Sequence, residues 1–478
     1  MRHLPLAVFL NITILLGSAL AGGCTSHFST KEETPSVLTE MPVVGATARP
    51  IESPTPEPTT SLPILSVKVD SPLQTIREVG GGNFIHRFGG VTGGFDPVSR
   101  LNWNTLQPRA ARVAIDLDEW EPVNDNEDPN DFYDDGFLDN EGSHVHATFQ
   151  FMQEVYPQGV EIIASVWRVP DWMVENPENE SQRIIPRERY PEVIESLAAW
   201  LMRARDEYHV KVSYLSFNEA NLGINVLLSP EDAIEMIREG GERFKELGLE
   251  TRWLLGDTSN MGENISYASQ IWDAVDIRGY LGPLAFHSWD AQASDDVLLG
   301  IGAFADKNGL DVWCTEGGWD AQLWQHPDRF PGYTHALNLA AIYARVLKMT
   351  RASRVLYWQM AGRDYSLNDG QKPYPSLQFL DEFKRQFPEG SQVVETSPDR
   401  SAIKFVAARK GEAVAVLLVN VSLGEDVWVE GLQDGTYSVV WSSAKEPEVK
   451  VSQLQFEGKR AKVHLEGFSI TFLTNRSR

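Results

Sequence analysis

Strand-like runs alternate with helical stretches through most of this 478-residue chain, and this alternation limits the fold more than any other feature. From about residue 64 to about 386, short runs rich in branched and aromatic residues are separated by segments whose apolar residues have helical spacing. The predicted strands are Val79–Ile85, Arg112–Leu117, Glu161–Val169, Val212–Phe217, Thr251–Gly256, Leu281–Phe286, Leu310–Thr315 and Val355–Met360. Strands and helices that alternate in this way over roughly 300 residues predict an α/β fold, a (β/α)₈ TIM barrel.

From about residue 390 the pattern changes to short alternating strands without helices between them. The predicted strands are Ala402–Ala407, Ala413–Asn420, Asp426–Val429, Thr436–Trp441, Ala461–Leu465 and Ser469–Thr474. We therefore predict a catalytic barrel over residues 63–388 and an accessory β-sandwich over 389–478. The leading run 64–69 precedes the first barrel strand and is a candidate to join the sandwich.

The first 24 residues have the pattern of an export signal. A short basic start is followed by the apolar run Leu4–Leu16 and by small residues up to Cys24. A cysteine directly after small residues resembles the bacterial lipobox, so we expect a lipid anchor at Cys24; an ordinary secretory signal that contains a cysteine is the alternative. Residues 25–62 are rich in Ser, Thr, Pro and Glu and predict a disordered tether. The protein is expected to be exported, as a cell-envelope lipoprotein or in secreted form.

Composition narrows the range of partners. The net charge of −25 argues against nucleic acid, which needs a basic surface. The 14 Trp and 13 Tyr offer flat faces on which sugar rings can stack, although core packing accounts for most of them. The two cysteines, Cys24 and Cys314, exclude a disulfide framework, and Cys314 is expected to be a buried, inert thiol. The sequence carries no signal for an oligomeric state.

Two of the predicted barrel strands lead directly into a glutamate, Glu219 and Glu316. In a TIM barrel the catalytic groups lie at the carboxyl ends of the strands, where these two residues fall. A pair of carboxyl groups on either side of a glycosidic bond is what glycoside hydrolysis requires. We predict that Glu219 is the general acid/base and Glu316 the nucleophile. The alternatives are structural: a strand end and helix cap for Glu219, and an ion pair with an arginine for Glu316.

Three further polar residues fit such a site. Arg112 begins the second predicted strand, and a buried arginine beside Glu316 would keep this carboxylate ionised, although it could equally pair with another acid. Asn218 is placed to donate a hydrogen bond to a sugar 2-hydroxyl. His287 follows the sixth strand and could orient the nucleophile or bind a hydroxyl, or else be an ordinary core residue.

Several tryptophans lie near the predicted carboxyl ends of the strands, where they could form sugar platforms or simply pack at the rim. The candidates are Trp167, Trp289, Trp319 and Trp358. His144 and His146 have i,i+2 spacing, but no acidic or cysteine set accompanies them in the sequence. We therefore predict neither a metal site nor a cofactor.

Ordered along the chain, these segments resemble clan A retaining glycoside hydrolases, most closely family 30, with families 5 and 39 next. The segments that carry the resemblance are Ala164–Met173, Phe217–Glu219, Thr315-Glu316, Trp358 and Gly467–Leu473. The resemblance implies an O-glycosyl hydrolase that cleaves β-linked glycosides or polysaccharides with retention, through a glycosyl-enzyme intermediate and without a metal. It also implies that Arg112, Asn218 and His287 line the subsite that binds the glycone.

The chain departs from the family pattern at two places. Ala220 stands where the family often has proline, and Trp289 stands where a tyrosine commonly follows the sixth-strand histidine. A tyrosine that would hydrogen-bond the nucleophile is therefore missing or supplied from elsewhere. A second hypothesis is a surface carbohydrate-binding lipoprotein on a degenerate barrel, without catalytic activity.

Overall fold

The computed structural model describes residues 62–476 apart from 133–135, 180–181, 224 and 401, and these residues belong to one compact unit, Ser61–Arg478. The predicted export signal 1–24, with Cys24, and residues 25–61 of the predicted tether lie outside the described residues. Within the described part of the chain, no helix combines the length and the apolar character needed to span a membrane.

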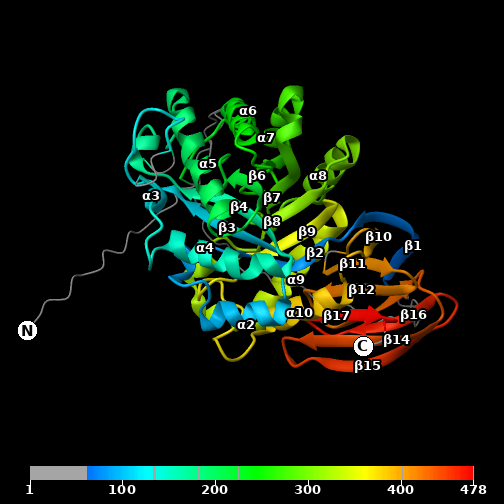
Figure 1. Cartoon of the computed structure of the whole chain (residues 1–478). Helices are drawn as coiled ribbons and strands as arrows, with labels where there is room; N and C mark the ends of the chain where they lie inside the picture. The colour runs from blue at the N-terminus through cyan, green and yellow to red at the C-terminus, as the bar shows by residue number, and fades with distance from the viewer. Residues whose placement is uncertain (1–61, 133–135, 180–181, 224, 401, 477–478) are drawn as a thin grey trace, which may run out of the picture. The chain divides into compact units, whose positions relative to one another are not determined.

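Eight parallel strands form a closed barrel, so the predicted TIM barrel is confirmed (Figure 1). The strands are β2 (Glu78–Phe84), β3 (Ala110–Asp116), β4 (Glu161–Arg168), β5 (Val212–Phe217), β6 (Arg252–Thr258), β7 (Leu281–His287), β8 (Val312–Gly317) and β9 (Ala352–Tyr357). The helices are α1 (His86–Gly89), α2 (Pro97–Leu106), α3 (Leu117–Trp120), α4 (His144–Val155), α5 (Tyr190–Asp206), α6 (Pro230–Glu246), α7 (Asn264–Asp273), α8 (Asp295–Asn308), α9 (Tyr333–Met349) and α10 (Pro375–Gln386).

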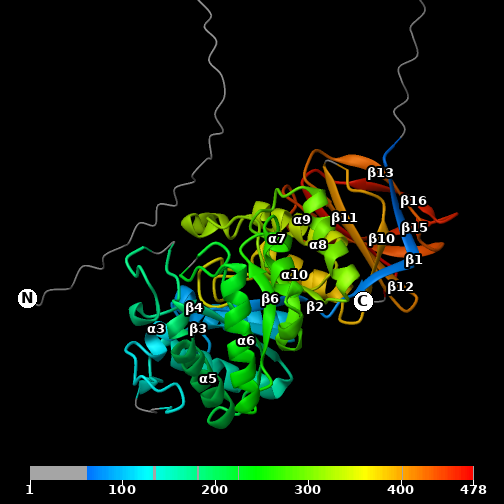
Figure 2. The ribbon, with the colours of Figure 1, turned by 90° about the horizontal axis from the view of Figure 1, so that it is seen from above.

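Helix α6 illustrates how the sequence sets these helices. The Ser229 side chain accepts a hydrogen bond from the Asp232 N–H, and Pro230 occupies the first helical position. Met236, Ile237 and other apolar residues on one side of the helix are buried, while the opposite side is charged. Neighbouring helices pack in the same way, and Figure 2 shows α5, α6 and α7 around the barrel strands.

The barrel interior changes from apolar to polar along the strand direction. An apolar layer near the amino ends of the strands consists of Ala110, Ile163, Tyr214, Leu254, Ala285, Trp313 and Leu356. Side chains alternate between the two faces of a strand, so the residues two positions further on also point inward. On β3, β4, β5 and β8 these residues are Arg112, Ser165, Ser216 and Thr315, and all four are buried. The strands thus place a ring of polar groups directly above an apolar floor.

The C-terminal region forms the β-sandwich, in a sheet with the order β15-β14-β17-β12-β11-β10-β1-β13-β16. Its strands are β1 (Ile64–Thr75), β10 (Gln392–Thr396), β11 (Ile403–Lys410), β12 (Ala413–Asn420), β13 (Glu425–Glu430), β14 (Gly435–Ser443), β15 (Lys450–Phe456), β16 (Arg460–Leu465) and β17 (Ser469–Thr474). The leading strand β1 pairs antiparallel with β10 and parallel with β13, and Figure 1 shows it in blue beside the orange strands. Strands β10 and β15 have no counterpart among the predicted strands.

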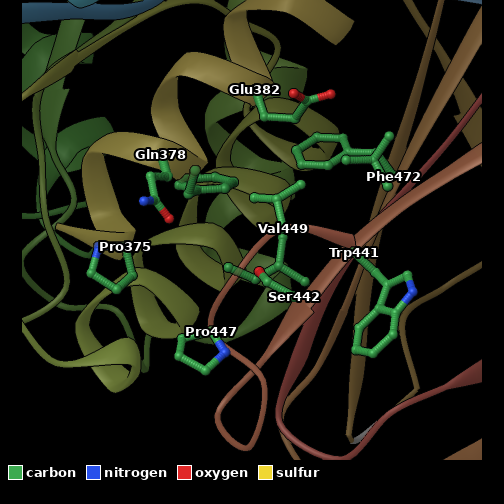
Figure 3. Close-up of a pocket in the computed structure, with 11 residues that line it drawn as sticks. Pro375, Gln378, Glu382, Trp441, Ser442, Pro447, Val449 and Phe472 are labelled. Atoms are coloured by element: carbon green, nitrogen blue, oxygen red, sulfur yellow. The ribbon is translucent and has the colours of Figure 1, made fainter. Parts of the chain in front are cut away.

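Aromatic packing joins the barrel to the sandwich. Phe379 and Phe383 of α10 and Phe387, which follows it, lie 6.4, 6.2 and 6.5 Å from Phe472 of β17, between ring centroids. A pocket of about 330 Å³ opens beside this contact, between α10 and strands β14 and β17 (Figure 3). No residue that lines this pocket comes from the carboxyl end of a barrel strand.

Candidate active site

Glu219 and Glu316 both lie at the carboxyl ends of barrel strands, and their side chains are buried. Glu219 follows β5 and adopts a φ of 51°, a left-handed conformation that is costly for a residue with a side chain. Its residue surface is 9% exposed, whereas Glu316 in β8 is 1% exposed. The strained backbone thus occurs at the tip of the strand that carries the more accessible carboxyl group.

His287, the last residue of β7, connects the two glutamates. Its Nδ1 lies 2.9 Å from Glu219 Oε1 and 3.2 Å from Glu316 Oε2. Oxygen atoms of the two carboxyl groups lie within 4.8 Å of each other. This upper limit joins one oxygen of each carboxyl group and is compatible with the roughly 5–5.5 Å between carboxyl groups that is typical of retaining glycosidases.

The Arg112 guanidinium is completely buried and holds the other side of Glu316. Its Nη1 donates to Glu316 Oε1 at 2.7 Å and to Asn83 Oδ1 at 3.0 Å. Its Nη2 donates to Asp257 Oδ2 at 2.8 Å and to Asn218 Oδ1 at 2.6 Å. A buried cation with this many acceptors both neutralises and orients the carboxylate. The structure therefore pairs Arg112 with Glu316, and also with Asp257, whereas the sequence alone did not decide which acid it contacts.

Asp257 also belongs to this site, although it was not among the residues predicted from the sequence. It is fully buried at the end of β6, where Ser216 Oγ donates to it at 2.6 Å and Thr315 Oγ1 at 2.5 Å. Its Oδ1 lies 3.3 Å from His287 Nε2, so Asp257 faces both Arg112 and His287. The predicted strand ended at Gly256, two residues before the observed end at Thr258. Asp257 directly follows that predicted strand, so the rule that identified Glu316 also applies to it.

Trp289 takes the place of the tyrosine that the family resemblance leads one to expect. Its indole Nε1 donates to Glu316 Oε2 at 3.1 Å. The indole reaches this position because it lies directly against Gly318, where a Cβ atom would come within 2.1 Å of the ring. Glu316 therefore receives hydrogen bonds on both carboxylate oxygens, from Arg112 on one and from Trp289 on the other.

Asn218 is held by its carbonyl group and keeps its amino group available. Its Oδ1 accepts from Arg112, while its Nδ2 is buried without a hydrogen-bond partner among the described residues. A buried amide donor without an acceptor is costly, so this group is expected to meet a ligand oxygen. Ser165 contributes indirectly, because its hydroxyl accepts from Arg112 at 2.9 Å.

Charge interactions set the protonation of the cluster. Burial raises the pKa of Glu316 to about 7, against the opposing effect of His287 and Arg112, which stabilise the carboxylate. Burial disfavours the imidazolium of His287, but Glu316, Asp257 and Glu219 outweigh burial and raise its pKa to about 10. Burial also opposes ionisation of Asp257, yet Arg112 and His287 hold its pKa well below the ordinary value. His287 is thus an imidazolium at neutral pH and can donate from Nδ1.

The four predicted tryptophans divide into two groups. The rings of Trp167 and Trp358 lie 5.0 Å apart between centroids and are tilted by 30°, in an aromatic cluster above the polar ring, and Trp289 packs against the same cluster. Trp319 also packs there, but its Nε1 donates to His335 and not to the glutamate pair. Trp319 therefore packs at the rim of the aromatic cluster and makes no hydrogen bond to Glu219 or Glu316 among the described residues.

A cleft of about 900 Å³ opens at the carboxyl ends of β3 and β4. Its lining residues are Asp118, Pro122, Val123, Arg168, Val169, Pro170, Asp171, Trp172, Arg183 and Asn225. Trp167, which belongs to the aromatic cluster, is the neighbour of Arg168 on β4. The cleft lies at the carboxyl ends of these two strands, and neither Glu219 nor Glu316 is among its lining residues.

The two histidines of the i,i+2 pair, His144 and His146, are each held by a carboxylate. His144 Nδ1 lies 2.8 Å from Glu119 and His146 Nδ1 lies 2.7 Å from Asp139, so each histidine has its own acidic partner. Glu219, His287 and Glu316 could together offer three ligand atoms to a metal ion. The Arg112 guanidinium already contacts this group and would oppose a further cation.

The fold and the site together define a class: a TIM barrel with a β-sandwich, in which two glutamates face each other at the carboxyl ends of barrel strands. No family model and no curated protein matches the sequence. Among solved structures, the chain is similar to a family 30 endoxylanase from Clostridium papyrosolvens C71, with a TM-score of 0.66 and 15% identity over 86% of this chain and all of that one (100%). The resemblance to family 30 is thereby confirmed at the level of the fold.

Two further structures extend this likeness. The catalytic domain of family 30 xylanase C from Talaromyces cellulolyticus has a TM-score of 0.65 and 16% identity, over 86% of this chain and 100% of that one. A family 39 enzyme from Xanthomonas axonopodis pv. citri has a TM-score of 0.56 and 11% identity, over 88% of this chain and 99% of that one. The chain therefore has a fold that glycoside hydrolases of both families share.

Replacing Asp257 by asparagine tests the buried network. Asp257→Asn keeps the shape but removes the charge that faces Arg112, so we expect it to lower the free energy of unfolding by about 3–5 kcal/mol. Because the pKa of Asp257 is depressed in the folded state, the difference from wild type should shrink as the pH falls below about 4. Urea denaturation at several pH values measures both effects.

The control for this variant is Asp426→Asn, which removes an exposed carboxylate that contacts Lys462 and His464 in the sandwich. The control should leave stability nearly unchanged, because exposed pairs contribute little. Equal stability of Asp257→Asn and wild type at pH 7 would contradict the structural importance of the Arg112–Asp257 pair.

Proposed function

We propose that this protein is a retaining glycoside hydrolase that cleaves β-linked glycosides or polysaccharides by double displacement. The observation that carries the proposal is the close approach of two buried carboxyl groups with different partners. Glu316 is held by Arg112 and Trp289, whereas Glu219 contacts the shared His287 and is the more exposed of the two. Different environments for two carboxyl groups are what separate a nucleophile from an acid.

The first chemical step divides between the two glutamates. Glu219 donates its proton to the glycosidic oxygen while a Glu316 oxygen attacks the anomeric carbon. The bond between that carbon and the glycosidic oxygen breaks, the leaving group departs as an alcohol, and a covalent glycosyl-enzyme remains. The buried cluster holds two cations, Arg112 and His287, against the carboxyl groups of Asp257, Glu316 and Glu219. One proton on Glu219 makes this cluster neutral, which is the state the first step requires.

The second step reverses these roles. Glu219, now a carboxylate, removes a proton from water, and the water oxygen attacks the anomeric carbon and releases Glu316. The Asn218 Nδ2 group, buried and without a hydrogen-bond partner among the described residues, donates to the sugar 2-hydroxyl in a bond that strengthens in the transition state. Two inversions at the same carbon give net retention.

Product stereochemistry tests the mechanism. The purified protein is incubated with xylans, other β-linked polysaccharides and aryl β-glycosides, and proton NMR follows the first product anomer. We expect the β-anomer to appear first. Initial release of the α-anomer would contradict the retaining mechanism, and sugar binding without turnover across the panel would favour the non-catalytic carbohydrate-binding protein instead.

Two variants assign the roles of the glutamates on any substrate found. Glu316→Ala should lower kcat on the order of 10⁴-fold or more, because the nucleophile is lost. Glu219→Ala should lower kcat about 10²–10⁴-fold, and azide should restore turnover by replacing the water that needs a base. Glu231→Gln, on the exposed start of α6, is the control. Full activity of Glu316→Ala would refute its assignment.

The pH dependence of kcat/KM tests how Glu316 is held. With its pKa raised to about 7, Glu316 takes up a proton below that pH, so kcat/KM should fall as the pH decreases through about 7. Trp289→Phe removes a hydrogen bond to the carboxylate, so the acidic limb should move to higher pH. The loss of this charged hydrogen bond should also lower the maximal kcat/KM about 10–100-fold.

Trp319→Phe is the matched control for this experiment, because its indole N–H donates to His335 and not to Glu316. It should leave the position of the acidic limb unchanged. If Trp289→Phe and Trp319→Phe have the same pH profile as wild type, Trp289 does not support the nucleophile.

We also propose export with a lipid at Cys24, on the strength of the apolar run and small residues that precede it. Expression of the full chain in a bacterial host should give a membrane-bound protein whose N-terminal peptide begins at Cys24 and carries the mass of a diacylglycerol. Cys24→Ser should abolish the lipid and release the protein from the membrane fraction. Detection of an unmodified Cys24 in the mature wild-type protein would contradict the proposal.

A further inference from the structure

A second cluster of carboxylates lies outside the candidate active site, between the segment that follows α3 and the start of α5. Asp125 of this segment and Glu192 and Glu195 of α5 each offer an oxygen atom, and these three atoms lie within 4.8 Å of one another. Glu192 and Glu195 are three residues apart on a helix, so they project from the same side. The cluster thus joins two segments of the chain that are far apart in sequence.

The same two segments carry buried oxygen atoms that have no hydrogen-bond partner among the described residues. These atoms are Glu121 Oε2, Asn124 Oδ1, Glu192 Oε2 and Glu195 Oε1. Glu121 and Glu195 are each only 1% exposed. A buried carboxylate oxygen without a donor is costly and calls for a positively charged partner.

Glu121 belongs to this cluster by position. Its Oε1 accepts from the Asp125 N–H at 3.4 Å, which fixes both residues within one turn of the chain. Arg189 in the same region contacts Glu127 at 3.6 Å.

The donor set selects the kind of ligand. Every candidate atom is a carboxylate or amide oxygen, the ligands that hard cations prefer, and Ca²⁺ takes six to eight of them at about 2.3–2.6 Å. Two oxygens on opposite sides of a Ca²⁺ ion lie about 4.8 Å apart at these distances. The spacing observed for Asp125, Glu192 and Glu195 is within that limit.

We propose that Glu121, Asn124, Asp125, Glu192 and Glu195 form a calcium site that fastens the segment between β3 and α4 to α5. The proposal does not depend on the catalytic assignment. It does concern a wall of the cleft, because Pro122 and Val123 line the cleft and the Trp172 Nε1 donates to the main-chain oxygen of Glu121 at 3.0 Å. The ion would therefore position this wall.

Direct binding to the full-length purified protein tests the site. After treatment with chelator and dialysis, calorimetric titration with CaCl₂ should show one site per chain, with affinity for MgCl₂ at least tenfold weaker. Addition of Ca²⁺ should raise the melting temperature by at least about 3 °C. Terbium offers a second readout, because Trp172 and Trp120 lie close enough to sensitise its luminescence: Trp120 Nε1 donates to the main-chain oxygen of Ser196, next to Glu195.

The double variant Glu192→Gln/Glu195→Gln removes two ligand charges. It should bind Ca²⁺ and terbium at least tenfold more weakly, while its melting temperature without metal stays at or above that of chelated wild type, because repulsion is relieved. Asp206→Asn/Glu207→Gln, a control with the same change of charge at the far end of α5, should bind as wild type does.

Three results would overturn the proposal. They are the absence of calcium heat and of any melting shift in the wild type, unchanged binding by the Glu192/Glu195 variant, and an equal loss of binding in the control variant. The first would mean that the buried carboxyl groups are held by shared protons alone. The last would mean that the ion responds to the net charge of the protein and not to this site.

Discussion

The buried ion pair between Arg112 and Asp257 lies at the centre of a hydrogen-bond network that links the barrel strands near their carboxyl ends. A guanidinium inside a protein loses its hydration, and only a nearly complete set of acceptors offsets that loss. Here the acceptors come from β2, β4, β6, β8 and the end of β5, so one side chain joins strands on all sides of the barrel. Moving any of these strands by one residue would turn an acceptor out of the barrel and leave the cation partly unpaired. The network therefore fixes strand register and site geometry together.

The two glutamates differ because the groups around them differ. One oxygen of Glu316 contacts a cation and the other accepts from an indole N–H. Glu219 itself has a left-handed backbone conformation and lies nearer to solvent. His287 touches both and prevents either carboxyl group from changing its charge without affecting the other. A proton taken up by Glu316 therefore also changes the electrostatic environment of His287 and Glu219.

The barrel and its two glutamates could be predicted from the sequence because the signal is local: an apolar run that ends in an acidic residue. Ser165 and Ser216 could not, because a serine within an apolar strand gains meaning only when the interior contains Arg112. The role of Trp289 depends on its contact with Gly318, a residue that is remote in sequence although the two touch in the structure. The strand β15 was missed because most of its residues are polar and exposed, so it lacks the alternation that marks a half-buried strand.

The pairing of β1 has a consequence for how the molecule is made. Val67 pairs with Thr396, so the first strand to leave the ribosome must wait for the synthesis of almost the entire barrel before its partners exist. Contacts between residues so distant in sequence form slowly, and an unpaired strand edge is prone to wrong association in the meantime. The sandwich can therefore form only after the C-terminal strands have been synthesised. A product truncated before β10 would expose the unpaired backbone edges of β1.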